Sequence, residues 1–130
     1  QAEVSRLQAS VHQALAEQRV EIRAAKIVVI DIASLAERVP YTWGEKKTNV
    51  LRAYWGLHAF AAGGLSAMVA DVLHPDPGSS QPRVAVCASG LDVSQESVRC
   101  ARHYQTGRPF AVRREGTLVI DFKTLPLPLS

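Results

Sequence analysis

The longest hydrophobic pattern in the chain runs from Thr48 to Leu73 and predicts a helix. Large apolar residues recur there at spacings of three and four, which is the period of one helical face. Thr48 or Asn49 supplies an N-cap oxygen, and the prolines that follow Leu73 prevent continuation. A second line of small residues would let another backbone approach closely, and it predicts an interface within the chain or with a partner. Its members are Gly56, Ala59, Gly63, Ala67 and Ala70.

The same segment is about long enough to cross a bilayer, which takes ~20 apolar residues. It contains His58, Ser66 and Asp71, and a charge at that depth is costly, so we predict a core helix and no membrane span. Because the chain begins at Gln1 rather than Met, we expect that an initiating segment has been removed. That segment could have been a signal peptide or a membrane anchor.

Four strands are predicted from shorter apolar runs. The β-branched run Lys26–Ile32 lacks alternation, which suits a strand covered on both faces, and Arg83–Ala88 forms a second strand. Gly107–Arg113 and Thr117–Phe122 flank the turn residues Arg114-Glu115-Gly116 and predict a hairpin. We place these strands in one mixed sheet packed against the long helix.

Two further helices complete the predicted single domain of class α/β or α+β. Residues 1–25 form an N-terminal helix with a narrow apolar stripe, serving as a packed arm, a neck or a dimerising segment, and residues 26–130 form the core domain. Asp92 with Gln95 has the spacing of a capping box and predicts a helix over the residues that follow. This places Cys87 on a strand and Cys100 on a helix in another layer. Layers lie ~10 Å apart, beyond the ~7 Å limit for a disulfide, so we expect two free thiols.

The composition and net charge of the chain exclude few classes of function. At 130 residues the chain can bury a core without staples, and its net charge of +3 allows an acidic partner without arguing for nucleic acid. Basic residues in the C-terminal third are spread over predicted helix, loop and hairpin, which is typical of a solvated face. They are Arg99, Arg102, Arg108, Arg113, Arg114 and Lys123.

The run Leu118–Thr124 contains the sharpest local motif. It resembles the Asp-x-Lys strand of RecB-like nucleases of the PD-(D/E)xK class, and the resemblance implies that Asp121 holds a metal and Lys123 positions water. Such a site needs a second carboxylate on the preceding strand. Here that strand begins Gly107-Arg-Pro-Phe110, without an acid, and no helix follows.

Asp31 ends the first predicted strand, where a carboxylate can serve chemistry or cap a following helix over Ser34–Val39. The scattered histidines have no ligand at metal-binding spacing, so neither a metal nor a cofactor is indicated. If the domain binds a small molecule or is an enzyme, a pocket beside the sheet would use Asp31 and Asp121 together with aromatic and histidine side chains. Those side chains are Tyr41, Trp43, Tyr54 and His58.

The order of elements also carries a family resemblance. The chain resembles the periplasmic part of TrbI-like proteins of F-type conjugative transfer systems in the order of a helical neck, the strand Lys26–Asp31 running into Ala33–Ala36, a long helical middle, and a strand, turn and helix over Val84–Glu96. Those proteins share with the periplasmic chaperone Skp a later strand that ends before an Asp-Ile-Thr-like helix start, which Asp92-Val-Ser94 resembles most. The chain departs from this pattern in its apolar middle helix and in the added hairpin. The resemblance covers about half of the chain.

This resemblance implies a non-enzymatic secretion component in the periplasm, anchored in the inner membrane by a segment since removed. Without the resemblance we would expect a cytoplasmic protein. Because the chain shows no complete catalytic set, we predict a protein-binding or assembly module whose partner is a protein or a second copy. The alternative is a small-molecule-binding or enzymatic domain, with a nuclease as its weakest form.

Overall fold

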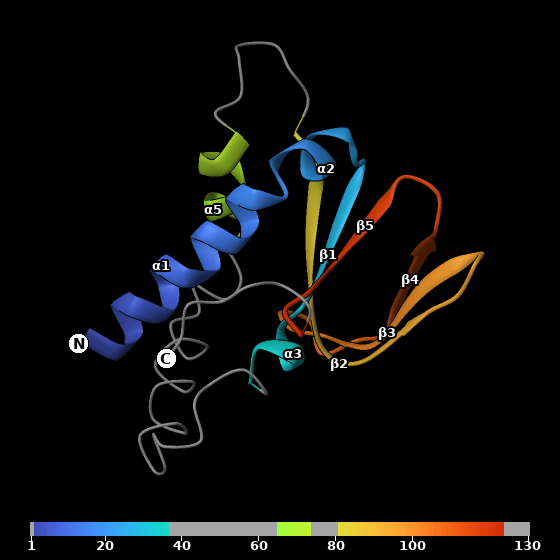
Figure 1. Cartoon of the computed structure of the whole chain (residues 1–130). Helices are drawn as coiled ribbons and strands as arrows, with labels where there is room; N and C mark the ends of the chain where they lie inside the picture. Colours follow the sequence, from blue (N-terminus) through green and yellow to red (C-terminus); the bar gives the residue numbers. More distant parts are fainter. Residues whose placement is uncertain (1, 37–64, 74–80, 124–130) are drawn as a thin grey trace.

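The structure is a computed structural model that describes residues 2–36, 65–73 and 81–123 (Figure 1). In the described residues, four helices and the strand β1 come first, and the four elements that follow are all strands. The elements are α1 (Ala2–Glu17), α2 (Arg19–Ala24), β1 (Ile27–Asp31), α3 (Ile32–Ala36), α5 (Leu65–Leu73), β2 (Arg83–Val93), β3 (Ser97–His103), β4 (Phe110–Arg113) and β5 (Thr117–Asp121).

The strands form one mixed sheet in the order β4-β3-β2-β1-β5. β1 is parallel to both of its neighbours, β2 and β5, whereas β3 is antiparallel to β2 and β4. Helices cover one side of this sheet, so the fold is of the α+β class with a mixed sheet, as predicted. The prediction of four strands is wrong because the sheet has five.

The additional strand is β3, where the sequence predicted a helix after Asp92. Of the residues that suggested a capping box, Asp92 belongs to β2 and Gln95 lies in the hairpin turn that follows. In that turn the Ser94 hydroxyl accepts the N–H of Ser97 at 3.0 Å, and the Ser94 N–H donates to the Ser97 carbonyl at 2.9 Å. Beyond the turn, buried Val98 and Cys100 alternate with exposed neighbours. Alternation with period two is the pattern of a half-buried strand, and it outweighs the local capping signal.

The predicted pairing of the last two strands is also wrong. Their turn forms, since the Thr117 N–H donates to the Arg114 carbonyl at 3.2 Å, but β4 pairs with β3 and β5 pairs with β1. The two strands do not pair because their apolar side chains are buried in cores on different faces of the sheet. Ile120 of β5 and Phe122, just after β5, belong to the core under the helices, whereas Phe110 at the start of β4 packs in a separate cluster.

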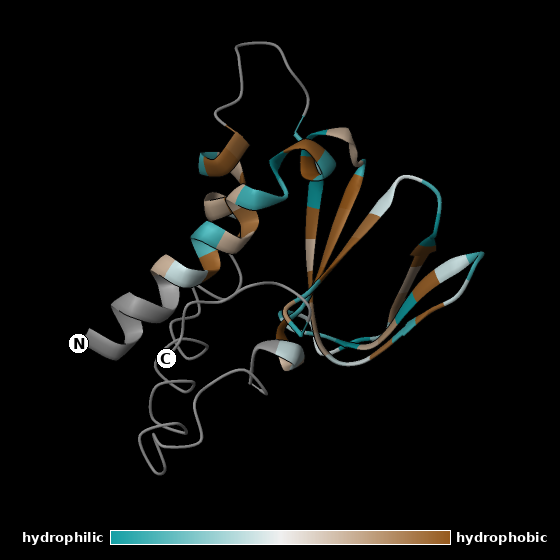
Figure 2. Cartoon of the chain, viewed as in Figure 1, coloured by the Kyte–Doolittle hydropathy of each residue, from teal (hydrophilic) through white to brown (hydrophobic). Residues whose placement is uncertain are grey.

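The main core lies between the helices and β1, β5 and the first half of β2. Figure 2 shows hydrophobic stretches on α5, β1 and β5 where they approach each other. Val11, Ala14 and Leu15 of α1 are fully buried here, so α1 packs on the domain. The other members of this core are Ile22, Val28, Ile30, Ile32, Leu65, Val69, Val72, Leu73, Val86, Ile120 and Phe122.

The second half of β2 turns away from the helices and carries β3 and β4 with it (Figure 1). We call residues 89–93, β3 and β4 the wing. The bend coincides with a shift in strand register between Cys87 and Ser89 and with a positive φ of 72° at Gly90. The concave face of the sheet holds a small second core of Val29, Cys87, Val98 and Cys100.

Cys87 and Cys100 form a disulfide in this second core, with their Cα atoms 5.9 Å apart. The prediction of two free thiols is therefore wrong. It assumed that Cys100 lies on a helix in another layer, whereas β3 is the immediate neighbour of β2 in the sheet. Neighbouring strands lie ~4.8 Å apart, within the reach of a disulfide.

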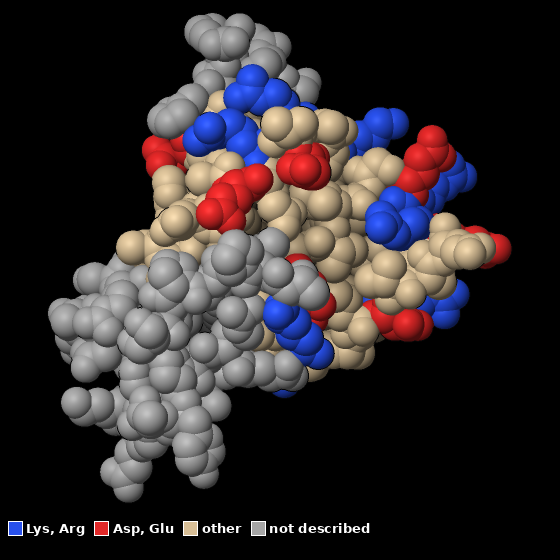
Figure 3. Space-filling model, viewed as in Figure 1, with Lys and Arg blue, Asp and Glu red and all other residues tan. Residues whose placement is uncertain are grey.

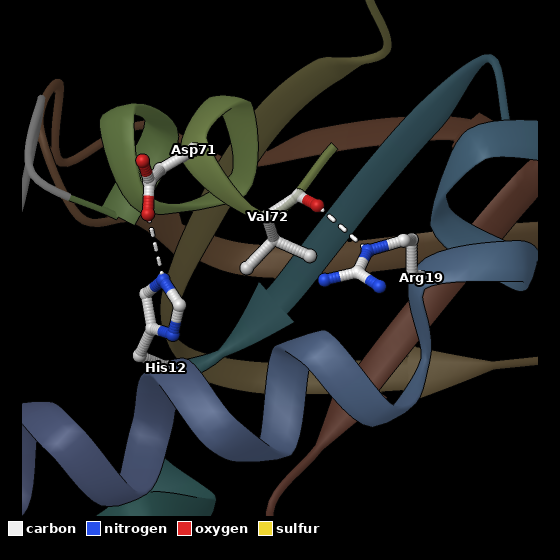
Figure 4. Close-up of polar contacts among 4 residues, drawn as sticks. All are labelled: His12, Arg19, Asp71 and Val72. Atoms are coloured by element: carbon white, nitrogen blue, oxygen red, sulfur yellow. Dashed lines mark hydrogen bonds and ion pairs between the residues drawn. The ribbon is translucent and has the colours of Figure 1, made fainter. Parts of the chain in front are cut away.

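Helix α5 is held against α1 and α2 by polar contacts as well as by its buried residues (Figure 4). His12 Nε2 lies 2.8 Å from the Asp71 carboxylate, and Arg19 Nε donates to the Val72 carbonyl at 2.8 Å. Arg23 donates to the Leu73 carbonyl at 2.7 Å. The last carbonyls of a helix have no partner inside it, so these two arginines satisfy the C-terminal end of α5.

Helix α5 is also the described part of the predicted long helix, whose residues 48–64 lie outside the described residues. It buries the bulky residues Leu65, Val69, Val72 and Leu73. Of the predicted small-residue line, Ala67 is exposed and Ala70 is partly buried. Within the described residues, no helix has the length and apolarity needed to cross a membrane.

Candidate functional site

The structure brings together two of the predicted site residues, Asp31 and Asp121. They are register partners at the carboxyl ends of β1 and β5. Burial raises the pKa of the Asp31 carboxyl above its ordinary value, and the Asp121 carboxylate raises it further. The backbone N–H groups of Ser34 and Ala33 and then the Lys123 ammonium act in the opposite direction and lower that pKa.

Asp31 functions as a helix cap in this arrangement, because the two backbone N–H groups that bond its carboxylate belong to the first turn of α3. Ser34 then joins the strand ends. Its buried hydroxyl donates to the Asp31 carbonyl at 2.6 Å and accepts the Phe122 N–H at 2.9 Å. The polar groups here fix the junction of β1, α3 and β5.

The strand that contains the nuclease-like motif pairs with a different strand from the one expected. The strand beside Asp121 is β1 rather than the preceding strand β4, and β1 contributes Asp31. Both carboxylates are already engaged by backbone, since Asp121 Oδ1 accepts the Lys123 N–H at 2.8 Å. In the described ranges, no three His, Cys, Asp or Glu side chains gather as a metal would need. The contacts of Asp31 and Asp121 with backbone N–H groups connect the ends of β1 and β5 to the residues that follow them.

A groove that the sequence did not predict lies between β4 and the start of β1 and β5. It is open to solvent and has a volume of about 350 Å³. Its lining combines apolar side chains from the sheet with charged side chains at the rim. The lining residues are Lys26, Ile27, Val112, Arg113, Glu115 and Thr117.

The groove runs beside the outer edge of β4, with which no other strand of the described residues pairs. Because the Arg114 N–H donates to the Glu96 carbonyl on the β3 side, and antiparallel pairs alternate, the backbone of Val112 faces β3. The backbones of Ala111 and Arg113 consequently face outward. In the described part of the chain, no other segment pairs with the N–H and C=O of Ala111.

By the same reasoning, no described strand pairs with the outer edge of β5 at Val119. The Ile27 N–H donates to the Gly116 carbonyl, so in this parallel pair the backbone of Leu118 faces β1 and that of Val119 faces away. The two free edges meet at the turn between them. There the Thr117 hydroxyl donates to the Arg113 carbonyl at 2.6 Å, and in Figure 1 β4 and β5 leave this turn in different directions.

A signal for this groove exists in the sequence but is ambiguous. Phe110 and Val112 alternate with Ala111 and Arg113, which marks β4 as a strand with one buried face. Nothing in that alternation says which strand is its neighbour. Pairing β4 with β5 would have used both free edges, and only the observed strand order leaves them open.

Of the remaining predicted site residues, the structure describes Ala67 and Ala70, and neither lines the groove. Ala67 and Ala70 lie on α5, on the helix side of the sheet. The pocket residues Tyr41, Trp43, Tyr54 and His58 and the small residues Gly56, Ala59 and Gly63 lie outside the described residues.

No match was found for this chain among protein-family models, curated proteins or solved structures. The resemblances to TrbI-like proteins and to PD-(D/E)xK nucleases thus stay predictions. The geometry of the described residues is the remaining evidence on function.

The surface charge around the groove is mixed. In Figure 3 basic and acidic side chains alternate over the side of the molecule that holds the wing. A nucleic-acid groove would present a continuous basic stripe. The described residues on this face form no such stripe.

Proposed function

We propose that this domain is a non-enzymatic protein-binding module that takes part in an assembly and binds its partner at the groove beside β4. The observation that carries the proposal is the open groove of about 350 Å³ bordered by the unpaired edge of β4. Unpaired strand edges are the places where a folded sheet accepts a further chain, and folded proteins normally protect them.

The disulfide supports an assembly outside the reducing cytoplasm. Disulfides persist in the periplasm and in secreted proteins and are rare in the cytosol. Cys87–Cys100 closes the hairpin that carries β4, so it braces the edge on which binding depends. It favours the periplasmic alternative.

The helical neck and the strand that runs into a helix keep the TrbI-like order, whereas the expected helix start at Asp92 lies in β2. Together with the disulfide, the retained part of this order supports a role in a conjugative secretion apparatus. A genomic neighbourhood rich in conjugation genes is the expected result of that role. A neighbourhood without them would remove the secretion role and leave the binding module standing.

Selection from a displayed library of random peptides tests the binding function. The bait is the whole chain with its disulfide intact, and the site of the enriched peptides is mapped by NMR amide shifts. We expect the largest shifts at Lys26, Ile27, Val112 and Arg113, which line or border the groove. A library that yields no binder, or shifts confined to the α1 and α5 side, would overturn the proposal.

Two matched variants sharpen this test. Glu115→Trp places a large side chain in the groove, whereas Val20→Trp places the same side chain on α2, where Val20 is 78% exposed. We expect the first variant to weaken binding of the selected peptides and the second to leave it unchanged. Equal weakening by both would point to a non-specific effect and contradict the groove as the site.

A further inference from the structure

We propose that the partner adds an extended segment to β4 as a sixth strand of the sheet, with apolar residues facing the groove and acidic residues facing outward. This inference rests on the proposed function and specifies its mode of binding. It commits to a partner protein with an alternating segment.

The outward-facing backbone groups of β4 determine where an added strand would form hydrogen bonds. Ala111 offers both its N–H and its C=O to the outside, so one residue of the partner can exchange two hydrogen bonds with it. Arg113 offers only its N–H, because its carbonyl accepts the Thr117 hydroxyl at 2.6 Å. The added strand therefore pairs at Ala111 and ends near Arg113.

Side chains of β4 fix what the partner would carry toward the groove. Phe110 and Val112 are partly buried against the second core, and Ile27 and Val112 line the groove. Residues of an added strand alternate between the same two faces as those of β4. Every second residue of the partner would thus extend this apolar lining.

The outward face favours acidic residues at the positions in between. Arg113 is exposed beside the free edge, and Arg99 lies directly opposite Ala111 on β3. Lys26 adds a third cation at the rim of the groove. Arg114, whose N–H donates to the Glu96 carbonyl, is a fourth cation nearby. The acidic groups nearby are Asp92 opposite Arg99, Glu96, and Glu115 in the groove lining, which leaves one cation in excess.

Substitution of Ala111 by proline is a direct test. The N–H of Ala111 faces away from β3, so Ala111→Pro removes the outward donor and leaves the β3–β4 hydrogen bonds intact, and proline is tolerated on strand edges. We expect affinity for an alternating Val/Glu peptide to fall about tenfold or more, the value of one or two hydrogen bonds. Ala111→Ser is the control that keeps the donor and should bind as the parent chain does.

Peptide chemistry supplies the second arm. The probes are an alternating Val/Glu peptide, an alternating Val/Lys peptide and a scrambled peptide with the composition of the first. We expect the order Val/Glu, then scrambled, then Val/Lys in fluorescence anisotropy, and a smaller gap between Val/Glu and Val/Lys in Arg113→Ala. Hydrogen exchange should show new protection at the Ala111 amide in the Val/Glu complex.

The outcomes separate this mode from the proposed function. If peptides bind at the groove with equal affinity in the Ala111→Pro and Ala111→Ser variants, strand addition is wrong and the proposed binding function still stands. Binding without preference for the acidic probe would overturn the stated partner chemistry. Failure of every probe and of the displayed library would overturn both. A circular dichroism spectrum and melting temperature near those of the parent establish that Ala111→Pro is folded.

Discussion

The two halves of the sheet are stabilised in different ways. β1, β5 and the first half of β2 are covered by helices, and their core includes large, fully buried side chains such as Leu15, Ile30 and Phe122. No helix of the described residues covers the wing, and its buried residues are Val98 and Cys100, the second of which is bridged to Cys87 in the first half of β2. Where apolar burial is small, a covalent bridge supplies part of the missing stability.

The same difference separates what each half offers to a partner. On the helix side, polar groups at the ends of elements are already used, as Arg19 and Arg23 show at the end of α5. On the wing side, the backbone of Ala111 keeps its hydrogen-bonding capacity free within the described part of the chain. A well-covered core positions the sheet, and the thinner wing leaves an edge available.

Phe122→Ala should produce the largest effect, because it breaks the helix-covered core. Phe122 is fully buried, and deleting a buried phenylalanine side chain costs about 3–5 kcal/mol of unfolding free energy. Guanidinium unfolding monitored by circular dichroism measures the change. Val20→Ala, at a position 78% exposed, is the control and should change stability little. Equal effects at both positions would contradict the assigned core.

Cys87→Ala combined with Cys100→Ala should come next, because it removes the brace of the wing. The bridge spans a sequence separation of 13 residues, and closing a loop of that size is worth about 3 kcal/mol. Hydrogen exchange locates the loss. Amides of β3 should lose more protection than amides of β1, and an equal loss in both strands would show that the two halves unfold as one unit.

Much of this fold follows from local patterns in the sequence. The β-branched run that forms β1 and the alternation within β4 are visible without any tertiary information. The acid at the end of β1 could be recognised as a possible cap, and Asp31 is one. These features succeed because a single element determines them.

Features that depend on which helices and strands pack or pair with each other could not be predicted from local patterns. The residues around Asp92 and Gln95 fit a capping box, yet the disulfide and pairing with two strands stabilise β3 as a strand. The groove depends on β5 pairing with β1 rather than with β4. That choice is decided by burial of Phe122 under the helices, which no local pattern contains.

Gly90→Ala should have a smaller effect that is confined to the bend of the wing. Gly90 has a φ of 72°, a region that costs other residues about 1–2 kcal/mol, and an added Cβ would clash with the Cβ of Ala101. Gly107 has the same φ but open space around its missing Cβ, so Gly107→Ala isolates the backbone cost. We expect Gly90→Ala to lower the melting temperature more than Gly107→Ala does. Adding Ala101→Gly to Gly90→Ala should recover the difference.

Asp31→Asn should have the smallest effect and a recognisable pH dependence. Folding raises the pKa of Asp31, first through burial and then through Asp121, so the protonated form is favoured in the folded state. This contribution to stability is fully present below the ordinary aspartate pKa and is lost as the pH rises through the raised folded-state pKa. Asparagine caps a helix about as well as aspartate, so Asp31→Asn should match the parent chain in acid and exceed it slightly at neutral pH.

Two comparisons decide whether that interpretation is right. Asp31→Ala removes the cap and should cost about 1 kcal/mol at neutral pH. Asp121→Asn removes the neighbouring charge but keeps an oxygen that can accept the Lys123 N–H, and it should shrink the pH dependence. Unfolding free energies measured from acidic to neutral pH give all three differences. If the difference between Asp31→Asn and the parent chain stays constant over that range, Asp31 does not titrate differently in the folded state. The carboxylates at the ends of β1 and β5 would then be independent, although the register places them side by side.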